Sequence, residues 1–146
     1  MPKDKKNKSE SRLKMKKNVG VMINYPVGDF LIRLKNASLT RKKSIEVPST
    51  KFVKTIAETL KKEGYLDEVI EKDAKLVVSL SFRKKSPNLT YVKLISTPGL
   101  RIYMDAEKIE SIKGPSIFLV STPKGIMTSR QAVKSRLGGE VIAEIL

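Results

Sequence analysis

The chain has 146 residues, of which 40% are hydrophobic, and its 30 Lys and Arg outnumber 15 Asp and Glu to give a net charge of +15. This length supports one large domain or two small ones with a buried core, and the charge favours a polyanionic partner, nucleic acid ahead of an anionic membrane. The chain has no Cys and no His, so disulfides and thiolate metal sites are excluded and the usual general base is missing. No apolar run reaches the roughly 18 residues of a spanning helix, and we expect a cytoplasmic protein that contacts no membrane and needs no metal or cofactor.

Residues 1–19 are predicted to form a basic tail ahead of two subdomains, at residues 20–84 and 85–146. The segment from Met1 to Lys17 carries eight Lys and Arg against two acidic residues, a net charge of +6, and contains little that is apolar. Such a segment is disordered alone and can order against phosphate. A tail that only keeps the protein soluble explains this composition equally well.

The first subdomain is predicted to fold in the order α-β-α-β-β, because apolar residues recur at helical spacing in two segments and alternate with polar residues in three. Pro26 suits the first turn of the first helix, with Asn24 as a candidate cap, and Ser49 or Thr50 is expected to cap the second. The expected elements are helices over residues 26–37 and 51–63 and strands over 45–47, 65–71 and 76–82. The apolar face of the second helix is expected to comprise Phe52, Val53, Ile56, Ala57 and Leu60.

The second subdomain is predicted to be mainly β with short helices, so the expected fold class is α+β. Basic turn residues at 83–88 and a Pro-Gly turn at 96–99 separate its apolar runs. Asp105 and Thr128 are expected to cap short helices, the latter through a capping box with Gln131. The expected strands cover residues 90–95, 100–104, 117–120 and 141–146, and the expected helices end near residues 109 and 135.

The segment Ser121-Thr-Pro-Lys-Gly125 is predicted to form a turn between a strand and a helix. Its hydroxyl groups can donate to phosphate or read a base edge, Lys124 supplies a positive charge, and Gly125 lets RNA approach the backbone closely. An ordinary turn would use the same Pro and Gly, and the Gly-x4-Gly-Lys spacing of a nucleotide-binding loop is absent. With so basic a chain, contact with RNA is the favoured interpretation.

Two further sets of residues are candidates for RNA contact. Arg101 and Tyr103 are two residues apart on one expected strand, so they share a face suited to ribose, phosphate or a base. An exposed Arg beside a half-buried core Tyr explains this pair equally well. The other set is a basic and polar face of the first subdomain, where a solvated helix surface explains any single residue. It comprises Arg33, Asn36, Arg41, Lys42, Lys43, Lys51 and Lys54.

Taken in order, these segments resemble the bacterial small-subunit ribosomal protein eight family from Tyr25 to Leu146. Each segment alone is weak, whereas their order and spacing together are highly specific. The matching segments are Asp29-Phe-Leu-Ile-Arg-Leu-Lys-Asn-Ala37, Val47-Pro-Ser-Thr-Lys51, Leu60-Lys-Lys-Glu-Gly-Tyr65, Ser96-Thr-Pro-Gly-Leu-Arg-Ile-Tyr103, Ser121-Thr-Pro-Lys-Gly-Ile-Met-Thr128 and Gly138-Gly-Glu-Val141.

The resemblance implies a structural protein of the small ribosomal subunit, with two subdomains packed on each other, that binds early and organises the central domain of the rRNA. It also implies neighbours from the ribosomal protein five and seventeen families and, in some bacteria, repression of its own operon through a similar mRNA hairpin. A free-standing RNA-binding translational regulator would need the same surface and stays an alternative. An enzyme acting on RNA or phosphate is disfavoured, because the chain has no His or Cys and its acidic residues are scattered.

The resemblance also implies that the loop from Ser121 to Gly125 contacts an irregular RNA helix with unpaired bases, and that Gly138, Gly139 and Glu140 form a second element beside this loop. Pro123 stands where the family usually has a third hydroxyl residue, and it has neither a hydroxyl nor an N–H group. Tyr25 stands where the family usually has an Asp that caps the first helix. No catalytic or metal-binding residue is expected. The expected RNA contacts are Ser121, Thr122, Lys124, Gly125, Gly138, Gly139, Glu140, Arg101, Tyr103, Arg33, Asn36, Ser49, Lys51 and Lys54.

Overall fold

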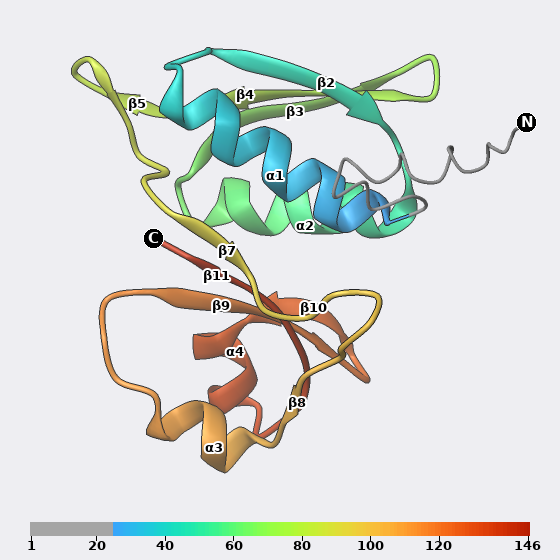
Figure 1. Cartoon of the computed structure of the whole chain (residues 1–146), viewed down its shortest axis with the longest axis vertical. Coiled ribbons are helices and arrows are strands. Elements are labelled where there is room, and N and C mark those ends of the chain that lie inside the picture. The colour runs from blue at the N-terminus through green and yellow to red at the C-terminus, as the bar shows by residue number, and fades with distance from the viewer. Residues whose placement is uncertain (1–24) are drawn as a thin grey trace, which may run out of the picture.

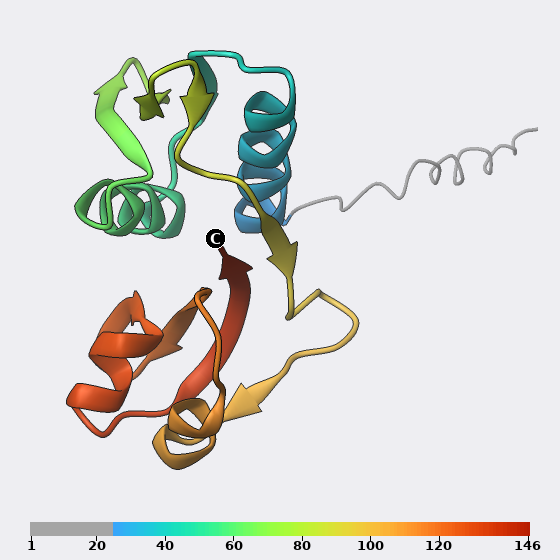
Figure 2. The same cartoon turned by 90° about the vertical axis from the view of Figure 1, so that its left-hand side faces the viewer.

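A computed structural model describes residues 25–146, in which a small sheet, a pair of helices, a larger sheet and a second pair of helices form successive layers (Figures 1 and 2). The expected basic tail and the candidate cap Asn24 lie outside the described residues. Helices and antiparallel sheets are both present, which confirms the α+β class. Within residues 25–146, none of the helices is both long enough and apolar enough to cross a membrane.

The first half has the predicted order α-β-α-β-β. Strand β4 lies between β2 and β3 in an antiparallel sheet, and both helices lie between this sheet and the second half of the chain (Figure 1). Asp73 and Ala74 join β3 to β4 with positive φ angles, as a two-residue type I′ hairpin turn requires. The elements are α1 (Pro26–Leu39), β2 (Ser44–Pro48), α2 (Lys51–Lys62), β3 (Leu66–Lys72) and β4 (Lys75–Leu80).

Helix α2 follows the predicted pattern with one correction. Of the two candidate caps, Thr50 serves, because its hydroxyl accepts the Val53 N–H at 3.2 Å. The buried stripe begins at Val53 and repeats at helical spacing to Leu60. Phe52, which was expected on this stripe, is 60% exposed, so that expectation was wrong. A helix turns by about 100° per residue, which carries Phe52 past the edge of the stripe.

Strand β11 organises the second half. It pairs with β9 along one edge, and along the other edge with β8 at its start and with β7 at its end. The predicted caps are confirmed, since the Asp105 carboxylate accepts the Lys108 N–H at 2.8 Å and Thr128 forms a capping box with Gln131. The elements are β5 (Phe82–Arg83), β6 (Ser86–Pro87), β7 (Val92–Leu94), β8 (Tyr103–Met104), α3 (Ala106–Ser111), β9 (Ile117–Thr122), β10 (Gly125–Thr128), α4 (Ser129–Lys134) and β11 (Gly139–Ile145).

The chain between β9 and α4 differs from the prediction. Ser121 and Thr122 belong to β9, and after a two-residue turn the chain pairs back on β9 as β10 before α4 begins. A hairpin therefore stands where a direct turn from strand to helix was expected. The four residues of β10 are too few to show strand alternation, and only their pairing with residues 119–122 identifies them as a strand.

One core is shared by the two halves. On β9, Ile117 and Leu119 belong to the core that includes α1 and α2, whereas Phe118 and Val120 pack with α3 and α4. On β11, a bulge leaves Ile142 without a partner on β9 and lets it join the larger core. Because both faces of this sheet are covered, its strand ends form a rigid support for the residues that extend beyond the core.

Candidate nucleic-acid interface

Strand β11 aligns expected RNA contacts from three strands in one row. Glu140 lies opposite Ser121 of β9 on one side and opposite Tyr103 of β8 on the other. Residues that lie directly opposite on neighbouring strands point to the same face of a sheet, so a hydroxyl, a carboxylate and a phenol stand side by side. Tyr103 is 69% exposed, which excludes its interpretation as a half-buried core residue. We call these three residues the β9–β11–β8 row.

Gly138 and Gly139 are required by the close approach of these strands. A Cβ at Gly138 would stand 2.5 Å from the Met104 carbonyl oxygen, and a Cβ at Gly139 would overlap the Ser121 carbonyl oxygen. Each added Cβ atom would lie far inside van der Waals contact distance of a neighbouring strand, so a side chain at either glycine would push β11 away from its neighbours. The two glycines therefore determine the spacing within the β9–β11–β8 row.

The two hydroxyl groups beside the β9–β10 turn have different environments. Thr122 is 8% exposed, and its hydroxyl donates to the Gly125 carbonyl at 2.8 Å and accepts the Lys124 N–H at 3.2 Å. Thr122 therefore closes the turn. Ser121 is half-buried, and its hydroxyl has no hydrogen-bond partner within residues 25–146. The side chain of Lys124 and the backbone of Gly125 are exposed at the tip.

Arg101 is held from two sides beside the row. Its guanidinium pairs with the Glu140 carboxylate at 3.2 Å and lies 5.2 Å from the centroid of the Tyr25 ring, which is a cation–π distance. The Tyr25 hydroxyl donates to the Ser96 carbonyl at 3.1 Å. Burial raises the pKa of Tyr25, and the Arg101 guanidinium partly offsets that rise. The Arg101 side chain stays 41% exposed while these contacts fix its position.

Ser96, which the sequence placed in a turn without a further role, is buried and connects two segments. Its hydroxyl donates to the Val141 carbonyl at 2.7 Å and accepts the Ile102 N–H at 2.9 Å. The second bond takes that N–H out of the strand ladder, so β8 is shorter than the strand expected over residues 100–104. Sequence reasoning missed both Ser96 and Tyr25 at this site, and the available signal for Tyr25 was an aromatic residue directly before a helix.

Three of the expected contacts of the first half, Ser49, Lys54 and Arg33, are tied to acidic neighbours. Lys54 pairs with one Glu71 carboxylate oxygen at 3.0 Å, and the Ser49 hydroxyl donates to the other at 2.7 Å. These bonds, that of Ser49 first, lower the pKa of Glu71. Arg33 pairs with Asp29 at 3.1 Å. Lys54 and Arg33 are partly neutralised on the surface, whereas the side chains of Lys124 and Lys51 have no ion-pair partner within residues 25–146.

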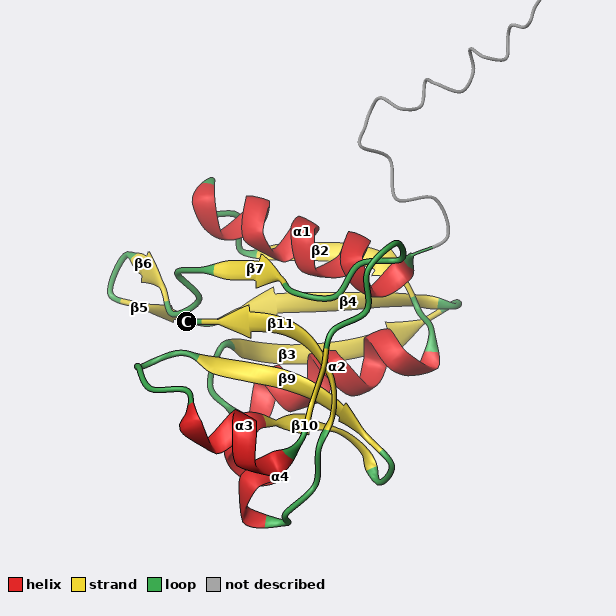
Figure 3. Cartoon of the chain, turned by 60° about the horizontal axis from the view of Figure 1, so that its bottom comes forward, coloured by secondary structure: helices red, strands yellow, loops and turns green. Residues whose placement is uncertain are grey.

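Expected contacts on the two helices of the first half lie toward opposite ends of the molecule. Helix α2 begins at Lys51, at the end of the molecule where the β9–β10 turn also lies (Figures 1 and 3). The C-terminal end of α1, which includes Asn36, points to the opposite end, where the β5–β6 turn lies. The structure therefore brings the start of α2 to the same end as the row and leaves Asn36 apart from it.

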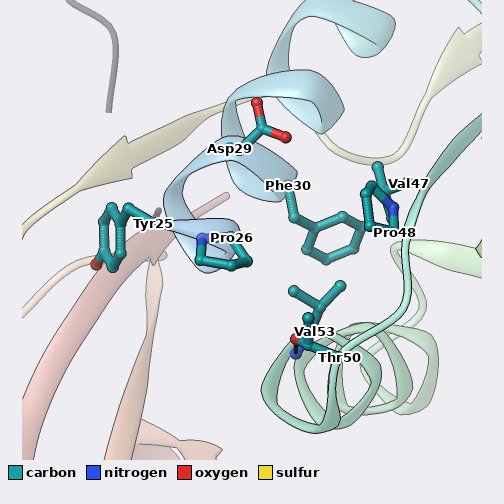
Figure 4. Close-up of a pocket in the computed structure, with 8 residues that line it drawn as sticks. All are labelled: Tyr25, Pro26, Asp29, Phe30, Val47, Pro48, Thr50 and Val53. Atoms are coloured by element: carbon teal, nitrogen blue, oxygen red, sulfur yellow. Dashed lines mark hydrogen bonds between the residues drawn. The ribbon is translucent and has the colours of Figure 1, made fainter. Parts of the chain in front are cut away.

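A pocket of about 270 Å³ opens where α1 and α2 begin (Figure 4). Phe30 and Val53 point toward each other across it, with Asp29 and Thr50 at its rim, whereas the Tyr25 ring turns away toward the second half of the chain. Its mainly apolar lining belongs to the packing of the two helices. Among residues 25–146, no group of three acidic side chains is placed to hold a metal ion.

The chain is similar to a family of known proteins over its described length. The family model of ribosomal protein S8 matches residues 25–146. The small ribosomal subunit protein uS8 of Acinetobacter baylyi is 43% identical over 122 residues, which cover 80% of this chain and 93% of that protein. The protein of the same name from Malacoplasma penetrans is 40% identical over 82% of this chain and 96% of its own length. That of Desulfovibrio desulfuricans is 35% identical over 85% and 99%.

Proposed function

The chain belongs to the ribosomal protein S8 family, and from this premise we propose that it binds small-subunit rRNA directly and organises the central domain of that RNA. Family membership itself makes the chain a structural, non-enzymatic protein of the small ribosomal subunit, located on cytoplasmic ribosomes. What is proposed beyond membership is the direct RNA contact, its place in the rRNA and the residues that make it.

The β9–β11–β8 row is the observation that carries this proposal. It places the Ser121 hydroxyl and the exposed Tyr103 ring on one face of a sheet whose strand positions are fixed by main-chain pairing. Structured RNA is recognised by such groups, which stack on unpaired bases and hydrogen-bond to ribose hydroxyls or base edges. The Arg101 guanidinium beside the row adds a planar donor for phosphate. The irregular helix with unpaired bases that the resemblance implies would offer partners for all of these groups.

We propose two roles for the residues around the row: some contact the RNA, and others hold the contact residues in place. We assign contacts with bases or ribose to Ser121 and Tyr103, because the Tyr103 ring is exposed and the Ser121 hydroxyl has no hydrogen-bond partner within residues 25–146. Contact with phosphate is assigned to the exposed Lys124 side chain and to the Gly125 backbone. Support is assigned to the residues that fix strand spacing, close the turn or hold Arg101, which are Gly138, Gly139, Thr122 and Glu140.

The first half is proposed to add phosphate contacts that follow charge rather than sequence. The first turn of α2, with Lys51 and Lys54, lies at the same end of the molecule as the β9–β10 turn (Figure 3). Because Glu71 holds Lys54 and Ser49, we expect these two residues to contribute less than an unpaired cation. Arg33 and Asn36 are proposed as outlying contacts, and the tail, with its charge of +6, as a source of non-specific attraction.

Further partners are proposed on the resemblance alone. They are neighbouring proteins of the small subunit from the five and seventeen families and a hairpin in the protein's own operon mRNA. The division into residues 20–84 and 85–146 also stays a proposal, with support from the two larger sheets, β2–β4–β3 and β10–β9–β11–β7, which lie on either side of it.

The experiment that tests the proposal compares two RNAs over a range of salt concentrations. The protein should bind a transcript of the rRNA central domain more tightly than an arbitrary duplex of equal length, and log K should fall steeply with log salt. Equal affinity for the two RNAs, or a flat salt dependence, would contradict it. A free-standing regulator would bind its mRNA hairpin but would be absent from small subunits sedimented in high salt, where we expect this protein to remain.

A further inference from the structure

Tyr25 occupies the position before α1 without acting as a helix cap. Its side chain makes no capping hydrogen bond, and Figure 4 shows its ring turned away from the pocket between the helices and toward the second half of the chain. The residue is nevertheless 9% exposed. A buried phenol at the entry to a helix must therefore be retained by contacts with the other half of the molecule.

Those contacts lead from α1 to the row in two steps. The Tyr25 hydroxyl donates to the carbonyl of Ser96. The Ser96 hydroxyl in turn bonds to Ile102, the residue before Tyr103, and to Val141, the residue after Glu140. The Tyr25 ring lies under the guanidinium of Arg101, which in turn pairs with Glu140. The position of the Arg101 guanidinium is thereby determined by two residues, Tyr25 and Glu140, that are themselves held in place.

We propose that Tyr25 is a positioning residue for the RNA interface, which holds the Arg101 guanidinium against Glu140 in the orientation that meets RNA. The inference rests on the proposed function, because it names the residue that orients one of the proposed contacts. It also gives the first half of the chain a part in recognition that is separate from its surface charge.

The ring is needed because the ion pair alone would not fix the guanidinium. A partly exposed pair of long side chains contributes little net stability, since both lose rotamer freedom when they pair. The Arg101 side chain is 41% exposed and that of Glu140 is 22% exposed. A buried aromatic ring against the guanidinium restricts the rotamers that Arg101 can adopt, so that Arg101 loses less entropy when RNA binds.

The test uses the full chain, the central-domain transcript and three substitutions. Tyr25→Phe keeps the ring and should leave RNA affinity within about twofold of wild type, whereas Tyr25→Leu removes the ring and should weaken it roughly three- to tenfold. Both should lower the melting temperature. The matched control is Phe30→Leu, which removes a buried ring from α1, the helix that follows Tyr25, and should lower the melting temperature without changing RNA affinity.

A double-mutant cycle separates positioning from simple destabilisation. In an Arg101→Gln background, Tyr25→Leu should still lower the melting temperature but should cause no further loss of RNA affinity. The inference is overturned if Tyr25→Leu keeps its full effect in that background, or if Phe30→Leu weakens RNA binding as much. Equal binding of the wild-type protein to the transcript and to an arbitrary duplex would instead contradict the proposed function, and this inference would then fail as well.

Discussion

The two halves of the molecule hold their polar residues in different ways. In the second half, main-chain pairing sets Ser121, Glu140 and Tyr103 side by side on a sheet covered on both faces. In the first half, Lys54 and Arg33 are surface cations held by carboxylates of their own chain. Positions fixed by the backbone can match the shape of a particular RNA, whereas paired surface cations offer a screened, general attraction. We therefore expect specificity in the second half and shared, non-specific affinity in both.

The largest effect is expected from Gly139→Ala, which breaks the row itself. The added Cβ would overlap the Ser121 carbonyl oxygen, and overpacking of this kind costs about 1–3 kcal/mol. The melting temperature should fall by roughly 4–12 °C, and affinity for the central-domain transcript should fall with it. Gly99→Ala is the control, because a Cβ there meets nothing within 4 Å. Equal losses in both variants would mean that close strand approach is not what requires glycine at this position.

The next effect distinguishes the two hydroxyls of the β9–β10 hairpin. Ser121→Ala should leave the melting temperature unchanged and weaken binding to the transcript by roughly 1–3 kcal/mol, with little change on an arbitrary duplex. Thr122→Val should lower the free energy of unfolding by about 1–2 kcal/mol, because it leaves the Lys124 N–H and the Gly125 carbonyl without their hydroxyl partner. Thermal melting and RNA binding should be measured on both variants. Equal losses of stability and of affinity in the two would contradict the separate roles of the two hydroxyls.

Two lysines compare the halves directly. Lys124→Ala should weaken binding to the transcript and to an arbitrary duplex alike, and should reduce the slope of log K against log salt by about one. Lys54→Ala should change the slope by clearly less, because Glu71 already pairs with Lys54. Salt titrations of the two variants on both RNAs supply the measurement. A larger slope change for Lys54 would place the main phosphate contact in the first half.

The smallest effect is expected at Glu71. Its pKa is lowered by Ser49 and Lys54, so it favours the folded state above its unfolded pKa, and this contribution disappears as the pH falls through the lower, folded pKa. Glu71→Gln should therefore be slightly less stable than wild type at neutral pH, and the difference should vanish in acid. Thermal melts between neutral and acidic pH test this, and a difference that grew in acid would contradict the assignment.

Much of the fold follows from local patterns, whereas the geometry of the site does not. Helical spacing predicted α1 and α2, and a capping box predicted the start of α4, because these signals lie within a few residues of each other. The alignment of Glu140 with Ser121 and Tyr103 depends on pairing between segments far apart in the chain. The need for glycine at position 139 has the same origin, since it arises from the backbone of another strand.

The resemblance named residues of the proposed interface without separating their roles. It placed Thr122 among the RNA contacts, and the structure uses its hydroxyl to close the turn. It marked Tyr25 only as a departure from a capping Asp, whereas the structure uses that side chain to join α1 to Arg101 and Ser96. Both differences depend on contacts between side chains and backbone groups that the spacing of residues along the sequence does not reveal.

The central claim is that the end of the sheet bearing the row faces the rRNA. Because the chain has no Cys, a single cysteine can carry a tethered RNA-cleaving reagent at a chosen position. Lys124→Cys places the reagent at the β9–β10 turn, and Lys85→Cys places it at the β5–β6 turn, at the other end of the molecule (Figure 1). The account predicts strong cleavage within one short segment of the bound central-domain transcript from position 124 and little there from position 85. Comparable cleavage of the same nucleotides from both positions, or none from position 124 in a protein that still binds, would contradict it.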